Sequence, residues 1–283
     1  PAMWRVCSVT SWFRVAEQGM VDFEVLSRAS TFAMGGLDGR LRFFASAHVL
    51  LPWRWRQYYP QDWVSFVTES HCRYSVEVMD PEAPELVVDR REVDVETLVS
   101  HPHRDVVHFA LRPADDEALQ GRVRRGEVPW GPIESMSAEP APPGSKARVM
   151  GFSVASEEGH GQGLGARGLD GLVEDTSGLL AHAEEEEEEE KGDSRIRIPT
   201  DMTCEFIGRT PHQCFVRTPK VLVDGMCGGP VVSLEAPGTC HGLVEGIVPT
   251  SHPNELLAGA AAIIDGPEIR DWAAPFLNAG PME

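Results

Sequence analysis

One cysteine of this chain lies in a setting suited to chemistry. Cys227 stands within residues 224–232, whose sequence DGMCGGPVV places three glycines around the sulfur. Glycines adopt backbone conformations that are closed to other residues, and they let a ligand approach closely. A thiol presented by such a turn is suited to nucleophilic catalysis. The alternative is a small buried cysteine in a turn that begins a strand, but the surrounding glycines favour a nucleophile.

Two further residues of chemically active types lie at the ends of predicted strands. His48 follows the apolar segment 41–45, and Asp105 precedes the apolar run 106–111. The alternative for Asp105 is a turn or capping residue, which is a common role of aspartate. Three more histidines are close to it in sequence and are interpreted as loop or strand residues: His101, His103 and His108.

Residues 51–63 gather aromatic and basic side chains. The segment holds three tryptophans, two tyrosines and two arginines, a combination that can bind single-stranded nucleic acid. The formal net charge of −19, from 44 acidic and 25 basic residues, opposes contact with phosphates. We therefore expect a surface loop whose rings pack on the protein and on each other, and no nucleic-acid partner.

The cysteines of the chain indicate its compartment. All six are scattered without a CxxC pair, which in 283 residues indicates no disulfide framework. A reducing intracellular compartment is predicted, either the cytosol or an organelle such as the mitochondrion. Two short His/Cys pairs, at 71–72 and 212–214, lack the second paired element of a zinc site, so no metal and no cofactor is expected. No apolar run reaches the roughly 18 residues of a membrane span, and no targeting signal is visible.

Short alternating segments and frequent turns dominate the chain, and 42 % of its residues are hydrophobic. The clearest predicted strands lie at 41–45, 63–68, 74–78, 85–88, 93–99, 106–111, 213–218, 242–248 and 258–264. The clearest helix is predicted at 267–277, because Pro267 suits the first helical position and Glu268 suits the positive helix end. A helical turn is also predicted at 115–120. This pattern predicts an all-β fold, a sandwich or a pair of barrels.

Residues 155–194 interrupt the strand pattern. They contain a glycine-rich stretch at 159–171 and a run of seven glutamates at 184–190. The glycine-rich stretch lacks the lysine of a phosphate-binding loop. Like charges repel one another and bury no surface, so we expect a flexible, solvated insertion.

Three motifs resemble those of the trypsin-like peptidases, and within them the HtrA (Deg-type) branch. Residues 46–50, SAHVL, are similar to the "NAHV" motif of that branch, and residues 105–111, DVVHFAL, are similar to its aspartate segment. Residues 225–232, GMCGGPVV, are similar to "GNSGGPLV". The strand at 242–248 resembles the one that lines the substrate cleft. The resemblance spans about residues 20–277 in order and spacing.

The resemblance implies two six-stranded antiparallel β-barrels with a short C-terminal helix. Residues 1–125 would form the barrel that carries His48 and Asp105, and residues 126–283 the barrel that carries Cys227. His48 would act as the base, Asp105 would orient it, and Cys227 would be the nucleophile. The backbone N–H groups of Gly225 and Cys227 would form the oxyanion hole.

The resemblance also implies a substrate pocket for the residue before the cleaved bond. Pro249, Thr250 and Ser251 would edge this pocket. Val221 stands six residues before Cys227, where trypsins carry an aspartate, so selectivity for arginine or lysine is not expected.

Two departures from the family pattern leave a second functional interpretation open. Cysteine replaces the usual serine, as in the picornavirus-type proteases, and Met226 replaces a polar residue. An active endopeptidase with a polypeptide substrate is one interpretation. The alternative is a catalytically inactive domain that serves as a scaffold subunit of a larger assembly, known by its protein partners. No PDZ-like region follows, so a protease domain alone is expected.

Overall fold

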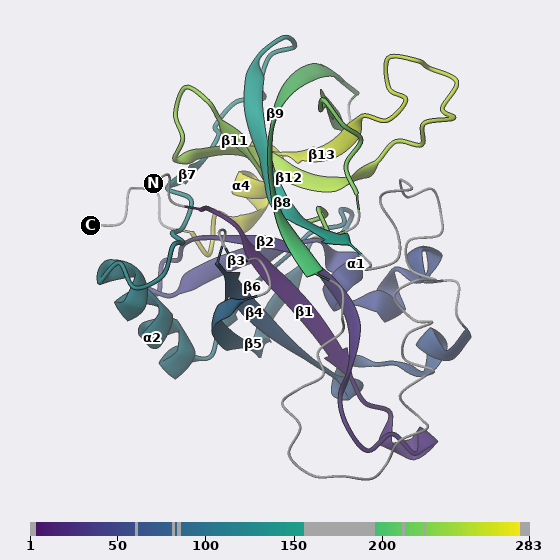
Figure 1. The fold of residues 1–283 in the computed structure, drawn as a ribbon, viewed down its shortest axis with the longest axis vertical. Helices are drawn as coiled ribbons and strands as arrows, with labels where there is room; N and C mark the ends of the chain where they lie inside the picture. Colours follow the sequence, from purple (N-terminus) through teal and green to yellow (C-terminus); the bar gives the residue numbers. More distant parts are fainter. Residues whose placement is uncertain are drawn as a thin grey trace.

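The chain forms two β-barrels, one above the other in Figure 1. The computed structural model describes residues 4–59, 62–80, 83, 86–155, 196–210, 213–223 and 225–277. From residue 156 onward, the insertion predicted at 155–194 lies outside the described residues, and so does its glutamate run.

The N-terminal barrel is a closed ring of six strands in the order β1-β2-β3-β6-β5-β4. Every neighbouring pair in it is antiparallel. Its strands are β1 (Cys7–Phe13), β2 (Glu24–Gly35), β3 (Leu41–Ala45), β4 (Cys72–Met79), β5 (Val87–Ser100) and β6 (Val107–Leu111).

The C-terminal barrel repeats this arrangement. Its strands follow the order β11-β8-β9-β10-β13-β12, and the pairing of β11 with β12 closes the ring. Counted along the chain, both barrels therefore have the order 1-2-3-6-5-4. The strands are β8 (Lys146–Ala155), β9 (Ile196–Arg209), β10 (Cys214–Arg217), β11 (Pro230–Ser233), β12 (Thr239–Ile247) and β13 (Ala261–Asp265). The short β7 (Ser135–Met136) adds to β12 in parallel.

Strand β3 shows how sequence alternation builds both a core and an interface. All five of its residues are buried. Since successive side chains point to opposite faces of a strand, both faces of β3 must be covered. Phe43 faces the N-terminal core and stacks on Phe109 and Trp130. Phe44 faces the other way and joins a cluster that includes Phe152 and other residues of the C-terminal barrel. Burial on both faces of one strand thus fixes the two barrels against each other.

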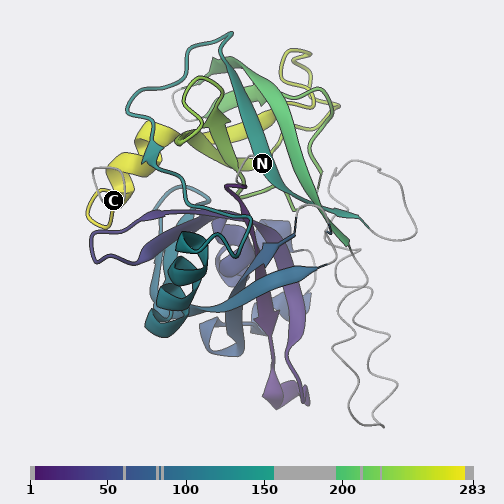
Figure 2. The ribbon, with the colours of Figure 1, turned by 60° about the vertical axis from the view of Figure 1, so that its left-hand side comes forward.

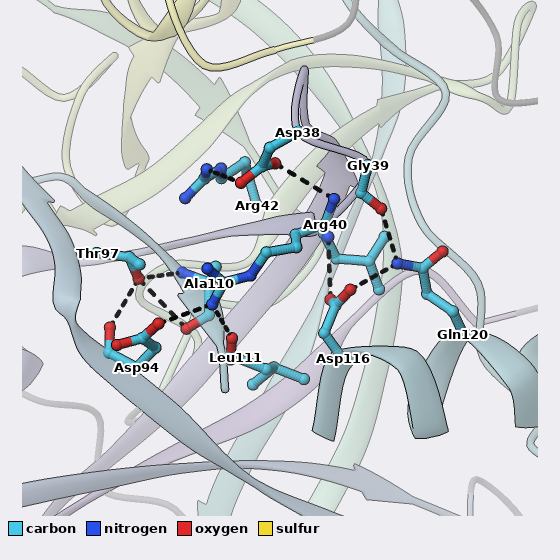
Figure 3. A network of polar contacts seen from close by, with 11 residues as sticks. Asp38, Gly39, Arg40, Arg42, Asp94, Thr97, Ala110, Leu111, Asp116 and Gln120 are labelled. Carbon is cyan, nitrogen blue, oxygen red and sulfur yellow. Dashed lines mark hydrogen bonds and ion pairs between the residues drawn. The ribbon is translucent and has the colours of Figure 1, made fainter. Parts of the chain in front are cut away.

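Among the described residues, two α-helices of more than one turn pack on this framework. Helix α2 (Pro113–Arg124) lies against the N-terminal barrel, and α4 (Gly266–Ala273) follows β13 (Figure 2). Figure 3 shows the polar contacts that hold α2: Asp116 accepts from the backbone N–H of Leu41 at 3.0 Å, and Gln120 donates to the Gly39 carbonyl at 3.0 Å. After α4 the chain returns to the N-terminal barrel, where Leu37 N–H donates to the Phe276 carbonyl at 3.0 Å.

The predicted all-β double barrel is confirmed, while several predicted bounds differ. The strand predicted at 63–68 is wrong, because the segment forms the 3₁₀ helix η4 (Asp62–Phe66). The buried Val64 and Val67 are three residues apart, which is the period of a 3₁₀ helix. The strands predicted at 85–88 and 93–99 form one strand, β5. The helix predicted at 267–277 ends at Ala273, since Pro275 cannot continue it.

Two further findings concern the whole described chain. All six cysteines are free thiols. Within the part of the chain that the structure describes, no helix has the length and apolar character needed to cross a membrane.

Candidate active site

His48 lies on α1 (Ala47–Leu50), a single turn that follows β3. A helix this short is unstable alone, and its carbonyl groups need partners. The Tyr59 hydroxyl donates to the His48 carbonyl at 2.8 Å, and the Tyr74 hydroxyl donates to the Leu50 carbonyl at 2.6 Å. The Ser11 hydroxyl donates to the Val49 carbonyl. Buried hydroxyls of the N-terminal barrel therefore hold the turn that presents His48.

Asp105 lies at the end of the loop that leads into β6, and it is 1 % exposed. The loop is folded around His101, whose Nδ1 accepts from the backbone N–H groups of His103 at 3.1 Å and Arg104 at 3.0 Å. Asp105 Oδ1 accepts from the backbone N–H of His48 at 2.7 Å, and its Oδ2 lies 2.5 Å from His48 Nδ1. This double contact orients the imidazole and directs its Nε2 away from the carboxylate.

The charge state of His48 follows from its neighbours. Burial lowers the pKa of His48, but the charge and hydrogen bond of Asp105, together with the nearby Cys227 side chain, outweigh it and raise the pKa to about 10. These neighbours therefore favour the protonated imidazole. His48, Asp105 and Cys227 come together at the junction of the two barrels.

The turn that carries Cys227 depends on glycine. Gly225 and Gly228 have φ of 85° and 83°, in the left-handed region that favours glycine. A Cβ atom at Gly228 would lie 2.2 Å from the Ser30 carbonyl oxygen, and one at Gly229 would lie 2.2 Å from the Met150 carbonyl oxygen. The glycines therefore allow the turn to pass close to the backbone of both barrels.

Ser30 of β2 fastens this turn to the N-terminal barrel. Its backbone N–H donates to the Cys227 carbonyl at 3.0 Å, and its hydroxyl donates to the Gly225 carbonyl at 2.7 Å. The same hydroxyl accepts from the backbone N–H of Phe152 at 2.8 Å. Sequence analysis missed Ser30, since a serine within a strand carries no local sign of a contact so far along the chain.

Strand β12 and a methionine hold the turn from the other side. The Gly228 N–H donates to the Val244 carbonyl at 2.9 Å, and the Val244 N–H donates to the Gly229 carbonyl at 2.9 Å. Met226 is 1 % exposed and belongs to the core of the C-terminal barrel. An apolar side chain thus anchors the residue beside the thiol.

The two amides predicted to form an oxyanion hole border the thiol. Among the described residues, neither the Gly225 nor the Cys227 N–H donates a hydrogen bond, whereas the Met226 N–H donates to the Val223 carbonyl at 3.3 Å. The carbonyls of Gly225 and Cys227, in contrast, both accept hydrogen bonds from Ser30. Within the described part of the chain, these two donors therefore have no acceptor.

The predicted pocket residues follow β12 on an exposed loop. Pro249, Thr250 and Ser251 are all exposed. Gly259, which sequence analysis missed, faces this loop: a Cβ there would lie 3.1 Å from Val221 Cγ2 and 3.7 Å from Thr250 Cγ2. Val221 is 39 % exposed and presents an apolar side chain at this point.

Two more residues near His48 were not singled out by the sequence. The ring of Tyr58 stacks on the His48 imidazole, with centroids 4.5 Å apart and planes at 21°. Glu245 of β12 lies 3.3 Å from Arg104 Nη2 and accepts from Gln213 Nε2 at 3.0 Å. Arg104 directly precedes Asp105, so this ion pair links the aspartate loop to the C-terminal barrel.

The aromatic segment 51–63 packs in part as expected, because Tyr59 is buried and Trp53 contacts the core.

The two closed barrels, with His48 and Asp105 on one and Cys227 on the other, give the chain a trypsin-like double β-barrel fold. No protein-family model and no curated protein matches the sequence. Solved structures that match include an inactive mutant form of Rv3671c from M. tuberculosis H37Rv, with 14 % identity and a TM-score of 0.44 over 94 % of this chain and 84 % of that one. Neuropsin, a serine protease expressed in the limbic system of mouse brain, matches with 11 % identity and a TM-score of 0.49 over 94 % and 92 %. At such low similarity the fold assignment rests on the strand pairing of this chain.

Proposed function

We propose that this chain is a cysteine endopeptidase of the trypsin-like fold, related to the HtrA branch, with Cys227, His48 and Asp105 as its catalytic triad. The observation that carries the proposal is the position of His48. It is held by Asp105 at Nδ1, and across the barrel junction it lies near enough to Cys227 for that side chain to raise its pKa. This is the relation that a nucleophile, its base and the orienting group require.

The proposed reaction divides peptide hydrolysis into two steps. The Cys227 sulfur attacks the peptide carbonyl carbon while the proton of the thiol resides on His48. The backbone amides of Gly225 and Cys227 stabilise the oxyanion, a contribution of about 3 kcal/mol for each donor. His48 then gives its proton to the leaving amine, and a thioester remains on Cys227. Water, deprotonated by His48, hydrolyses the thioester and restores the thiol.

The substrate is proposed to be a polypeptide with an apolar residue before the cleaved bond. Gly259 lies beside both Val221 and Thr250. The loop that contains Thr250 also contains Pro249 and Ser251. Val221 offers no charge to pair with arginine or lysine. Transfer of an apolar substrate side chain from water to such a surface is favourable.

A thiol-reactive peptide probe tests the proposal against the alternative of an inactive scaffold domain. The chain is treated with a peptidyl vinyl sulfone that carries valine next to the warhead, and the modified residue is found by mass spectrometry. Labelling is expected at Cys227 and should be lost in His48→Ala, while Cys72, the other partly exposed thiol, serves as the internal reference. Labelling of Cys227 no faster than Cys72, together with no cleavage of a peptide library, would favour the scaffold.

A further inference from the structure

Two consecutive tyrosines contact His48 in different ways. The Tyr59 hydroxyl holds the His48 backbone, whereas the Tyr58 ring covers one face of the imidazole at 4.5 Å. Tyr58 ends the 3₁₀ helix η3 (Arg56–Tyr58), and its N–H donates to the Trp55 carbonyl at 3.0 Å. It also packs against the apolar cluster around Phe13. The ring is therefore held in place by its own segment and does not depend on His48 for its position.

The groups that face the imidazole are few and have distinct roles. Among the described residues, Asp105 contacts Nδ1, the Cys227 side chain lies near enough to raise the pKa of His48, and the Tyr58 ring lies over the flat face. Burial and the nearby charges of Asp105, Cys227 and Glu245 raise the pKa of Tyr58, so its hydroxyl stays neutral. Glu245 itself is paired with Arg104.

An aromatic face carries partial negative charge and attracts a cation above it. A neutral imidazole has little to gain from this contact, whereas a protonated one is favoured about 2- to 30-fold, the larger value where water is excluded. A stacked ring at this distance therefore favours the protonated form of His48 over the neutral form. It also blocks rotation of the imidazole out of the line between Asp105 and Cys227.

We propose that Tyr58 is a positioning residue that stabilises the protonated His48 and thereby keeps Cys227 in its reactive thiolate form. The inference rests on the proposed function, since it concerns the same thiol. It adds a residue that no family motif in the sequence identifies.

The pH dependence of Cys227 alkylation tests this role directly. The full chain is treated with iodoacetamide between pH 4 and pH 9, and the rate at the Cys227 peptide is followed by mass spectrometry. Tyr58→Phe keeps the ring, while Tyr58→Leu keeps apolar bulk without it. The Phe variant should match the parent. In the Leu variant the rate on the plateau above the acid limb should fall about 2- to 30-fold, because the neutral thiol–imidazole pair gains population at the expense of the ion pair. The acid limb itself should keep its position, since His48 is protonated on both sides of it.

A second measurement covers a Leu variant that folds poorly. The His48 resonances are titrated by NMR in the Cys227→Ser background, with Tyr58→Phe and Tyr58→Met compared. The His48 transition should occur at lower pH in the Met variant and be unchanged in the Phe variant. Equal profiles for the ring-containing and ring-free variants would overturn the inference, and so would a Phe variant whose rate falls as far as that of the Leu variant.

Failure of this inference and failure of the proposed function give different results. If peptides are cleaved at Cys227 but Tyr58→Leu leaves the alkylation profile unchanged, only the role of Tyr58 is wrong. If the profile depends on the ring but no peptide is cleaved, the role of Tyr58 stands and the peptidase proposal fails.

Discussion

The N-terminal and C-terminal barrels share one strand order, yet they hold their parts of the candidate site differently. In the N-terminal barrel, His48 lies on a turn whose carbonyls accept from tyrosine hydroxyls of the same barrel, and Asp105 comes from a strand end of that barrel. In the C-terminal barrel, the Cys227 turn takes its shape from glycines and is fastened by Ser30 of the other barrel. His48 is thus held from within its own barrel, whereas the Cys227 turn is completed only by contact between the barrels.

This difference predicts where the site is vulnerable. A change at the junction of the barrels should disturb the thiol before it disturbs the contact between His48 and Asp105. A change within the N-terminal barrel should alter the charge state of His48 and leave the turn around Cys227 in place. Single substitutions at the junction and within the N-terminal barrel separate these two effects.

Gly228→Ala should have the largest effect on stability. The new Cβ would meet the Ser30 carbonyl at 2.2 Å, and the residue would keep a φ of 83°. Backbone strain and overpacking each cost about 1–3 kcal/mol, so we expect the free energy of unfolding to fall by about 2–6 kcal/mol in urea denaturation.

Gly39→Ala is the matched control for that variant. Gly39 has a φ of 78°, but a Cβ there meets no atom within 4 Å, so only the backbone term of about 1–2 kcal/mol applies. Equal losses in the two variants would mean that the contact between the barrels adds nothing, and the comparison of the halves would then fail.

Asp105→Asn should have the largest effect on activity among changes that spare the fold. The amide keeps the shape but loses the charge that raises the pKa of His48. We expect peptide cleavage to fall roughly 10²- to 10⁴-fold, and the alkaline limb of kcat/KM to move to lower pH because the pKa of His48 falls. Asp94→Asn, which breaks the ion pair with Arg40 in the same barrel, should change activity less than twofold. A similar loss in both variants would contradict a specific role for Asp105.

His108 provides a contrast in pH dependence within the N-terminal barrel. It is fully buried among Phe44, Trp272 and Phe276, and neither ring nitrogen has a hydrogen-bond partner among the described residues. Burial, followed by the charge of Arg42, lowers the pKa of His108 to about 4. The unfolded chain binds this proton near pH 6.5, so the folded state loses stability as pH falls from 6.5 to 4.

The expected loss at His108 is about 2 kcal/mol between pH 7 and pH 4.5, because the pKa is about 4 in the folded chain and about 6.5 in the unfolded chain. His108→Phe should remove this part of the acid sensitivity, as measured by urea denaturation at pH 7 and pH 4.5. Unchanged acid sensitivity in the Phe variant would show that His108 is not buried in its neutral form.

Ser30→Ala should have the smallest of these effects on stability. It removes two hydrogen bonds and leaves the Phe152 N–H and the Gly225 carbonyl without their partner, for about 1–3 kcal/mol. Alkylation of Cys227 should slow while the His48 contact to Asp105 persists. Ser65→Ala, at an exposed hydroxyl that donates to the Asp62 carbonyl, should cost less than about 0.5 kcal/mol. If Ser30→Ala behaves like this control, Ser30 does not fasten the turn.

The sequence could predict what is encoded locally. Alternating strands and turns predicted an all-β fold, and the resemblance of three motifs to the trypsin-like peptidases implied the double barrel. The glycines around Cys227 marked the turn that the structure contains. Local periodicity also gave one wrong prediction. A strand was predicted at 63–68, but Val64 and Val67 pack at the spacing of a 3₁₀ helix.

The remaining site residues could not be predicted because they act over long sequence distances. Ser30 and Gly225 are 195 residues apart, and Gly259 matters only because Val221 and Thr250 come to meet it. In the sequence, Tyr58 is one of several rings in an aromatic segment, and only the structure shows that it stacks on His48. Such residues have ordinary types in ordinary segments, so their roles depend on the packing of the two barrels.

Trapping of the acyl-enzyme tests most directly whether His48 activates Cys227 as a nucleophile. The chain is mixed with a nitrophenyl ester of N-acetyl-valine, quenched in acid within milliseconds to seconds, and examined by mass spectrometry. We expect a burst of nitrophenol and an N-acetyl-valyl adduct on the Cys227 peptide, absent in Cys227→Ala and strongly slowed in His48→Ala. No adduct on Cys227, or an adduct that forms at the same rate without His48, would contradict the proposed triad.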